Sequence, residues 1–237
     1  MQALLDAPSM TGLPDTARLA AIVILAKTNA DSGQTGRIRA VDLGRWLGVS
    51  ESSIDHTALP ALRDRNLVTT NVTTDSTGQT TGLTCRLTPV TLARQQADRE
   101  GALFLDRREL ATLWRLIEAL FGPGWSHKEG PPTPAGLCAE RTGRGAATDR
   151  LCLLLLVLHA RSDGTVRMVA GSVGGQGRGR GDSTAARALG CTASGASKVL
   201  ARLRVAGLVV SVRVPSGSGL KCKTELQVPA VADAHRR

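Results

Sequence analysis

Hydrophobic and polar positions follow the same order of predicted elements twice along the chain. In the first half, apolar residues at helical spacing and two β-branched runs predict three helices and a hairpin. Asp15 or Thr16 is the expected N-cap of the first helix, and Gly48 ends the second. The predicted elements are a helix over 15–30, an extended piece over 37–40, helices over 41–48 and 50–66, and strands over 67–72 and 81–90.

The second half repeats this order. Thr192 is the expected N-cap of its last helix, and Asp182 or Ser183 that of the short helix before it. The repeat indicates that one supersecondary unit occurs twice in a chain of 237 residues. The predicted elements are a helix over 147–162, a short strand over 165–170, a Gly- and Arg-rich loop over 171–182, helices over 183–190 and 192–207, and strands over 208–214 and 220–228.

A different pattern separates the two copies. A capping box at Asp106 and Glu109 predicts a helix from Arg107 to Phe121. Its apolar stripe has two interpretations: a helix packed on its own domain, which we favour, or the seam of a homodimer. A Pro- and Gly-rich spacer follows at 128–136. The stripe consists of Leu110, Leu113, Trp114, Ile117, Leu120 and Phe121.

Two pairs of short motifs mark equivalent points of the copies. "LGVS" at 47–50 corresponds to "LGCT" at 189–192, and "NLV" at 66–68 to "GLV" at 207–209. Together with the order of the elements, these motifs resemble the large bacterial superfamily of winged helix-turn-helix proteins. The resemblance covers roughly 15–89 and 146–229.

The resemblance has consequences for the turn and for the fold. In that superfamily the Gly, here Gly48 and Gly190, allows a tight turn, and the Ser or Thr, here Ser50 and Thr192, caps the next helix. It implies a mostly α fold with small β-hairpins (α+β), in which a helical linker joins two winged-helix domains. We therefore expect an N-terminal domain over 1–90, a helical linker and spacer over 91–145, and a C-terminal domain over 146–237.

Charge distinguishes the two copies. The formal charge of the chain is +10, and a charge of this size favours a polyanionic partner. Residues 1–90 contain eight basic and eight acidic side chains, and 91–145 contain eight and seven. Residues 146–237 contain fourteen and five, a net charge of +9. With three Trp, two Phe and no Tyr, base stacking on aromatic rings is a poor candidate mode of binding.

The basic copy contains the main candidates for contact with double-stranded DNA. In its last helix, Ala196, Val199, Leu200 and Leu203 form an apolar face, which leaves small, hydroxylated and cationic residues elsewhere. Such residues suit a helix that enters the major groove. The candidates are Ser194, Ser197, Lys198, Arg202 and Arg204 on the helix, Arg213, Lys221 and Lys223 on the hairpin, and Arg178 and Arg180 in the Gly-rich loop.

The first copy is less suited to phosphate. Its third helix carries Glu51, Asp55 and Asp64, and Pro60 interrupts the hydrogen-bond ladder. The helix is also one residue longer than its counterpart, and a local bulge would absorb both anomalies. This copy is either a weaker, more sequence-selective DNA reader or a protein-docking module. Its candidate DNA contacts are Ser52, Ser53, His56 and Arg63.

Other functional classes find little support. The Gly-rich loop places Arg180 and Gly181 where a phosphate-binding loop needs Lys and Ser or Thr. Four scattered His and five distant Cys give neither a catalytic constellation nor a metal site, so we expect no enzyme, cofactor or metal. The apolar run at 151–160 is too short to span a bilayer, and no signal peptide is apparent.

The pattern as a whole predicts a cytoplasmic, nucleoid-associated protein that binds double-stranded DNA sequence-specifically. We expect a transcriptional regulator without a membrane partner. A plasmid-type replication initiator is the alternative, and a winged-helix adaptor that binds protein is less favoured because of the positive charge. Usage rich in Ala, Gly and Arg but poor in Lys favours a high-GC, actinobacterial-type source.

Overall fold

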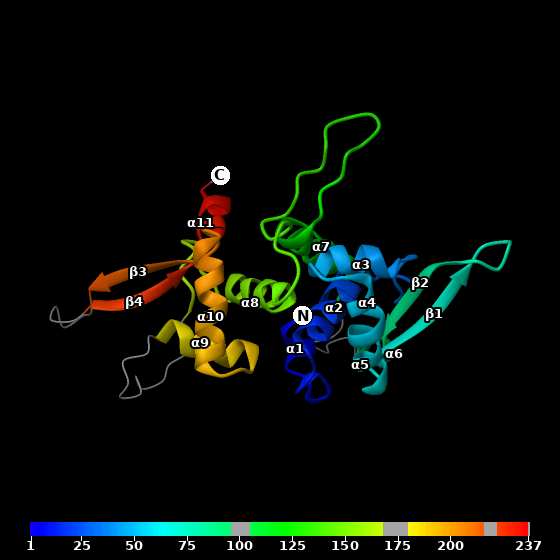
Figure 1. Cartoon of the computed structure of the whole chain (residues 1–237), viewed down its shortest axis with the longest axis horizontal. Coiled ribbons are helices and arrows are strands. Elements are labelled where there is room, and N and C mark those ends of the chain that lie inside the picture. Colours follow the sequence, from blue (N-terminus) through cyan, green and yellow to red (C-terminus); the bar gives the residue numbers. More distant parts are fainter. Residues whose placement is uncertain (96–104, 168–179, 216–221, 237) are drawn as a thin grey trace. The chain divides into compact units, whose positions relative to one another are not determined.

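The computed structural model describes residues 1–95, 105–167, 180–215 and 222–236. The chain divides into two compact units, Met1–Ala147 and Thr148–Arg237. Each unit combines helices with one two-stranded antiparallel hairpin, so the fold is mixed, with the small hairpins that the sequence predicted (Figure 1).

The first unit is built around α2 (Asp15–Ala26). Its buried residues include every position from Leu19 to Ala26, and α3, η2, α5 and α7 all contact it. The other elements of this unit are α1 (Gln2–Leu5), η1 (Pro8–Met10), α3 (Ala40–Leu47), α4 (Glu51–Ser53), the π-helical η2 (Ile54–Ala58), α5 (Leu59–Asp64), β1 (Val68–Thr74), β2 (Thr80–Leu87), α6 (Thr88–Gln95) and α7 (Arg107–Phe121).

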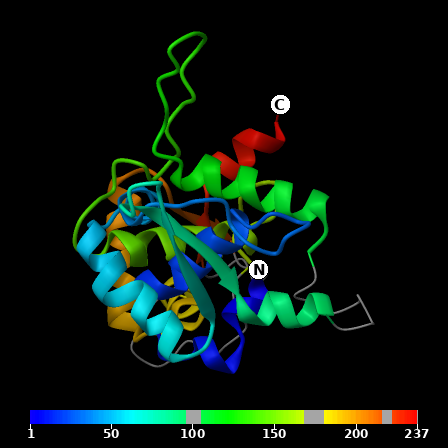
Figure 2. The same cartoon turned by 90° about the vertical axis from the view of Figure 1, so that its right-hand side faces the viewer.

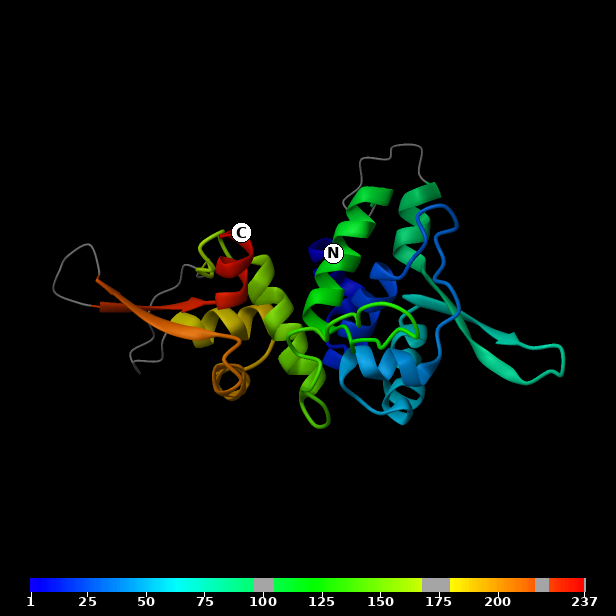
Figure 3. The same cartoon turned by 90° about the horizontal axis from the view of Figure 1, so that it is seen from above.

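An extended segment before α3 joins the edge of the hairpin. Ile38 and Leu83 exchange backbone hydrogen bonds of 2.8 Å, and Gln34 forms a bridge with Arg86. The free ends of β1 and β2 extend away from the helices of this unit (Figures 1 and 3). Because the segment at 34–38 lies between α2 and α3 in sequence, it fixes the start of α3 against the hairpin.

The turn between α3 and α4 has the predicted geometry. Gly48 adopts a left-handed conformation with φ of 72°, which a side chain would disfavour. The Ser50 hydroxyl then accepts a hydrogen bond of 3.3 Å from the Ser53 backbone N–H, as an N-cap does. A Cβ added at Gly44 would lie 2.7 Å from the Val49 carbonyl oxygen, so the turn also needs Gly at that position.

The bulge predicted near Pro60 is present. Residues Ile54–Ala58 form a π-helical turn directly before α5, and Pro60 lies in the first turn of α5. Pro lacks an N–H and its ring crowds the carbonyl four residues back, so a regular α-helix would be disrupted here. The wider turn accommodates both Pro60 and the extra residue.

Helix α7 has the predicted bounds and cap. Asp106 accepts a 2.7 Å hydrogen bond from the Glu109 N–H, and Glu109 accepts one of 2.9 Å from the Asp106 N–H. The predicted stripe is buried except for Trp114, which is half-buried, and α7 contacts α2. The described residues of 91–145 therefore belong to the first unit, and a long loop after α7 projects from it (Figures 1 and 2).

The second unit follows the same order. Val166 donates a 2.8 Å hydrogen bond to Leu226, which places a short extended piece beside the hairpin, as in the first unit. Ala185, Ala196, Leu200 and Leu226 are fully buried in its core. The elements are α8 (Ala146–Leu158), α9 (Arg180–Leu189), α10 (Ala193–Val205), β3 (Val210–Pro215), β4 (Cys222–Gln227) and α11 (Pro229–His235).

Several boundaries differ from the predictions. The N-cap of α2 is Pro14, so the predicted cap at Asp15 or Thr16 is wrong. The helix ends at Ala26 rather than at residue 30, because Asn29 accepts hydrogen bonds from two following N–H groups and so forms a turn. Residues 88–90, predicted as strand, start α6, where Pro89 suits a first helical turn. Helix α9 starts before its expected caps, at Arg180, and α1, η1 and α11 were not predicted.

We expect Asp106→Ala to destabilise the first unit by about 1 kcal/mol, because it removes the side-chain cap of α7. All three Trp residues of the chain lie in this unit, so urea unfolding followed by Trp fluorescence reports on it specifically. Arg108→Ala, an exposed change in the same helical turn, is the control and should not lower stability. Equal midpoints for the two variants would contradict the role of the cap.

Candidate nucleic-acid interface

Helix α10 is held at its start by the turn that precedes it. Gly190 adopts φ of 71°, and the Thr192 hydroxyl accepts a 3.1 Å hydrogen bond from the Gly195 N–H. The predicted apolar face is buried, with Ala196 and Leu200 fully so. The opposite face of α10 is therefore fixed in orientation relative to the core of its unit.

That opposite face is exposed, and most of its side chains are small. Ser194, Lys198, Ala201 and Val205 follow one line along the helix, and all four are exposed. Val205 is 91% exposed, although its side chain is apolar. Ser197 is half-buried on the flank of this face. The face thus offers one amine, one hydroxyl and two small apolar groups.

Arg202 takes part in an ion pair within the unit. Its guanidinium donates three hydrogen bonds to Asp149 of α8, from Nε at 3.1 and 2.9 Å and from Nη2 at 2.6 Å. The Asp149 side chain is fully buried, whereas that of Arg202 is 42% exposed. The hydrogen bonds raise the pKa of Arg202. The charge of Arg202 is therefore compensated internally, and its side chain holds α10 against α8.

Arg204 lies on the other flank and is half-buried. Its Nε is buried, and no group in the described part of the chain accepts a hydrogen bond from it. Of the three predicted cations on α10, Lys198 is therefore the one that the exposed face presents fully.

The hairpin of this unit adds one described cation. Arg213 on β3 is exposed and lies opposite Thr224 of β4. Lys223 lies opposite Val214 in the ladder, and Arg180 is the first residue of α9, but their side chains are outside the described parts. Arg178 and Lys221 lie outside the described residues altogether. Figure 3 shows the hairpin extending away from the helices of the second unit.

The equivalent face of the first unit mixes both signs of charge. Ser52, His56 and Arg63 are exposed there, and Ser53 is half-buried beside Ser50. Arg63 donates a 3.0 Å hydrogen bond to the Thr70 hydroxyl of β1. The predicted acidic residues of this face are also exposed: Glu51, Asp55 and Asp64.

Carboxylates also compensate the cations around α3. Asp42 accepts hydrogen bonds from Arg39 at 2.7 Å and from Arg45 at 3.4 Å. A polyanion approaching this unit would therefore meet pairs of opposite charge, which gives it a weaker attraction than the second unit provides.

Sequence reasoning missed the partner of Arg202. Asp149 lies 53 residues before it, at the start of the apolar run of α8. A carboxylate next to such a run is a signal in itself, because a charge that enters a core needs a partner. The sequence contains many Arg residues that could pair with Asp149, and only the packing of α8 on α10 shows that Arg202 does so.

Comparisons of the chain with models of known protein families, with curated protein sequences and with solved structures gave no significant match. Within the described ranges, no group of three or more His, Cys, Asp or Glu residues is placed to hold a metal ion. No described helix combines the length and apolar character needed to cross a membrane.

We expect Arg202→Ala to destabilise the second unit by about 2 kcal/mol, because it removes three charge-assisted hydrogen bonds from a buried carboxylate. Hydrogen–deuterium exchange in peptides from α8 and α10 should become faster. Lys198→Ala, an exposed change one turn earlier in the same helix, should leave these rates unchanged. Equal exchange in the two variants would show that the ion pair adds nothing to stability.

Proposed function

We propose that both units are winged-helix domains and that the protein binds double-stranded DNA sequence-specifically, as a transcriptional regulator. The observation that carries this proposal is the exposed face of α10. It presents Lys198, Ser194 and the small residue Ala201 on a helix with a fixed orientation. A helix of this kind fits the major groove, where small residues allow close approach and an amine or hydroxyl reaches base edges and phosphates.

The order of elements supports the winged-helix assignment. In each unit a helix, an extended piece, two helices joined by a Gly-containing turn and a hairpin follow one another. In the proposed complex, α10 reads the major groove. Arg213 and the basic hairpin of β3 and β4 contact the phosphate backbone beside it.

The distribution of charge favours the second unit for the stronger electrostatic contact with DNA. Residues 146–237 carry a net charge of +9, and the first 90 residues carry none. The helix of the first unit that corresponds to α10 exposes three carboxylates near its cations. In this proposal the second unit anchors the protein, and the first unit makes the weaker contact.

Lys198→Ala should weaken binding to duplexes selected from a random-sequence pool and lower the slope of log affinity against log salt by about 1. Fluorescence anisotropy of the full-length chain over a series of salt concentrations measures both quantities. Arg236→Ala is the matched control, because it removes the same charge just after α11, where Arg236 pairs with Asp233. It should change affinity by less than Lys198→Ala.

Equal losses in the two variants would mean that net charge, and not α10, determines binding. Selection that enriches no sequence, together with no binding in dilute buffer, would refute the proposal. Footprints of the protein on DNA from its source genome distinguish promoter sites from the directly repeated origin sites of a replication initiator.

A further inference from the structure

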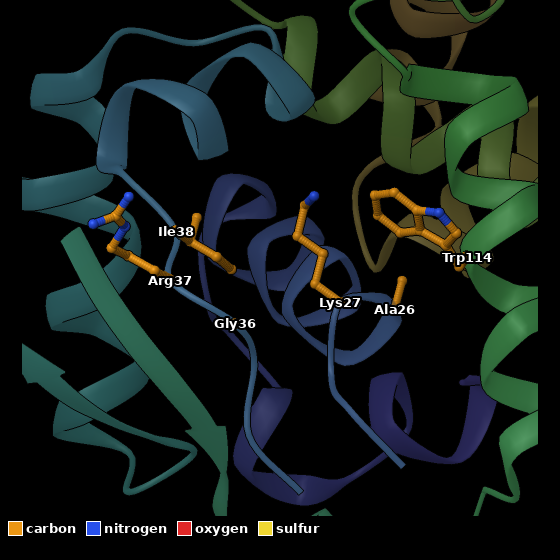
Figure 4. A pocket seen from close by; sticks show the side chains of 6 residues that line it. All are labelled: Ala26, Lys27, Gly36, Arg37, Ile38 and Trp114. Atoms are coloured by element: carbon orange, nitrogen blue, oxygen red, sulfur yellow. The ribbon is translucent and has the colours of Figure 1, made fainter. Parts of the chain in front are cut away.

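An ammonium group lies beside a pair of neighbouring indole rings in the first unit. Lys27, the residue that follows α2, places its Nζ 4.3 Å from the ring centroid of Trp46 and 4.2 Å from that of Trp114. The two ring centroids are 4.8 Å apart, with the ring planes tilted by 41°. Figure 4 shows Lys27 between the extended segment of Ile38 and the Trp114 ring of α7.

Among the described residues, no carboxylate is in direct contact with this ammonium. In the part of the chain that the structure describes, no ion pair joins Lys27 to an acidic side chain. Asp42 on α3 and Glu118 on α7 act on Lys27 only through their fields, and Asp42 accepts hydrogen bonds from Arg39 and Arg45. Ring faces attract a cation, but they do not neutralise it.

The partial burial of Lys27 changes the pKa of its amine. Loss of solvent lowers the pKa of Lys27 to about 8, and the fields of Asp42 and Glu118 oppose this shift. A partly buried charge without a counter-ion is costly, and an anion placed beside it would reduce that cost.

A cavity of about 350 Å³ adjoins this lysine. Lys27 is its cation nearest to the Trp rings, while the Arg37 side chain lies beyond Ile38 and is turned away from Lys27 (Figure 4). The remaining walls are largely apolar. The full lining is Ala26, Lys27, Gly36, Arg37, Ile38 and Trp114. Apolar walls with a few polar groups are the usual form of a small-molecule site, and here Lys27 and Arg37 are the charged groups of the lining.

We propose that this cavity binds a small organic anion, a carboxylate with an apolar body. The carboxylate pairs with the Lys27 ammonium, and the apolar body contacts Ile38 and the Trp114 ring. Inorganic phosphate is not the preferred ligand, because this strongly hydrated ion has no apolar part that could contact the apolar walls. The proposal does not depend on DNA binding.

Benzoate is the probe and benzamide, its uncharged analogue, is the control, each titrated calorimetrically into the full-length chain. We expect benzoate to bind and benzamide to bind at least tenfold more weakly. Since the anion requires the protonated amine, affinity should fall about tenfold from pH 7 to pH 9, across the Lys27 pKa of about 8.

Two variants test the position of the anion. Lys27→Met keeps the length of the side chain but removes the charge, and it should lower benzoate affinity at least tenfold. Arg37→Met removes the other cation of the lining, and it should change affinity by less than threefold. Benzamide or phosphate binding as tightly as benzoate, a pH-independent affinity, a larger effect at Arg37 than at Lys27, or no binding of benzoate would each overturn the proposal.

Discussion

The ion pair between Asp149 and Arg202 determines how the second unit presents its exposed helix. A carboxylate removed from water needs a compensating charge, and Arg202 supplies one from the last turn of α10. The pair connects α8 to the flank of α10, so the line from Ser194 to Val205 faces solvent. Because Arg202 is paired with Asp149, it would attract a polyanion less strongly. Lys198 is then the main cation that the exposed face of α10 presents.

The same order of elements occurs in two units with different electrostatics. Both contain a turn with Gly at a left-handed backbone conformation, followed by a Ser or Thr cap. Away from that turn the copies diverge. The helix of the first unit contains a π-turn before Pro60 and exposes Asp55 among its polar residues. The shared turn preserves the geometry, whereas the exposed residues are free to change the charge.

Local signals made much of the fold predictable. The capping box at Asp106 defines the start of α7, Gly48 and Thr192 define one turn each, and Pro60 predicted the bulge. Predictions failed where two local signals competed, as at residues 88–90, where β-branched residues lie beside a Pro that suits a helix start. Contacts between residues far apart in the sequence were also not predicted. Periodicity shows which face of an element is buried, but not which side chain of another element contacts that face.

The same constraint on buried charge explains why the two units contain different kinds of site. In the second unit the fully buried carboxylate of Asp149 is compensated by Arg202 of the same unit. In the first unit the charge is the Lys27 ammonium, and the neighbouring carboxylate Asp42 accepts hydrogen bonds from two arginines instead. Two indole rings stabilise the cation without neutralising it. Arg202 is an internal counter-ion for Asp149. Lys27 has no such counter-ion among the described residues, so an external anion in the adjoining cavity can pair with it.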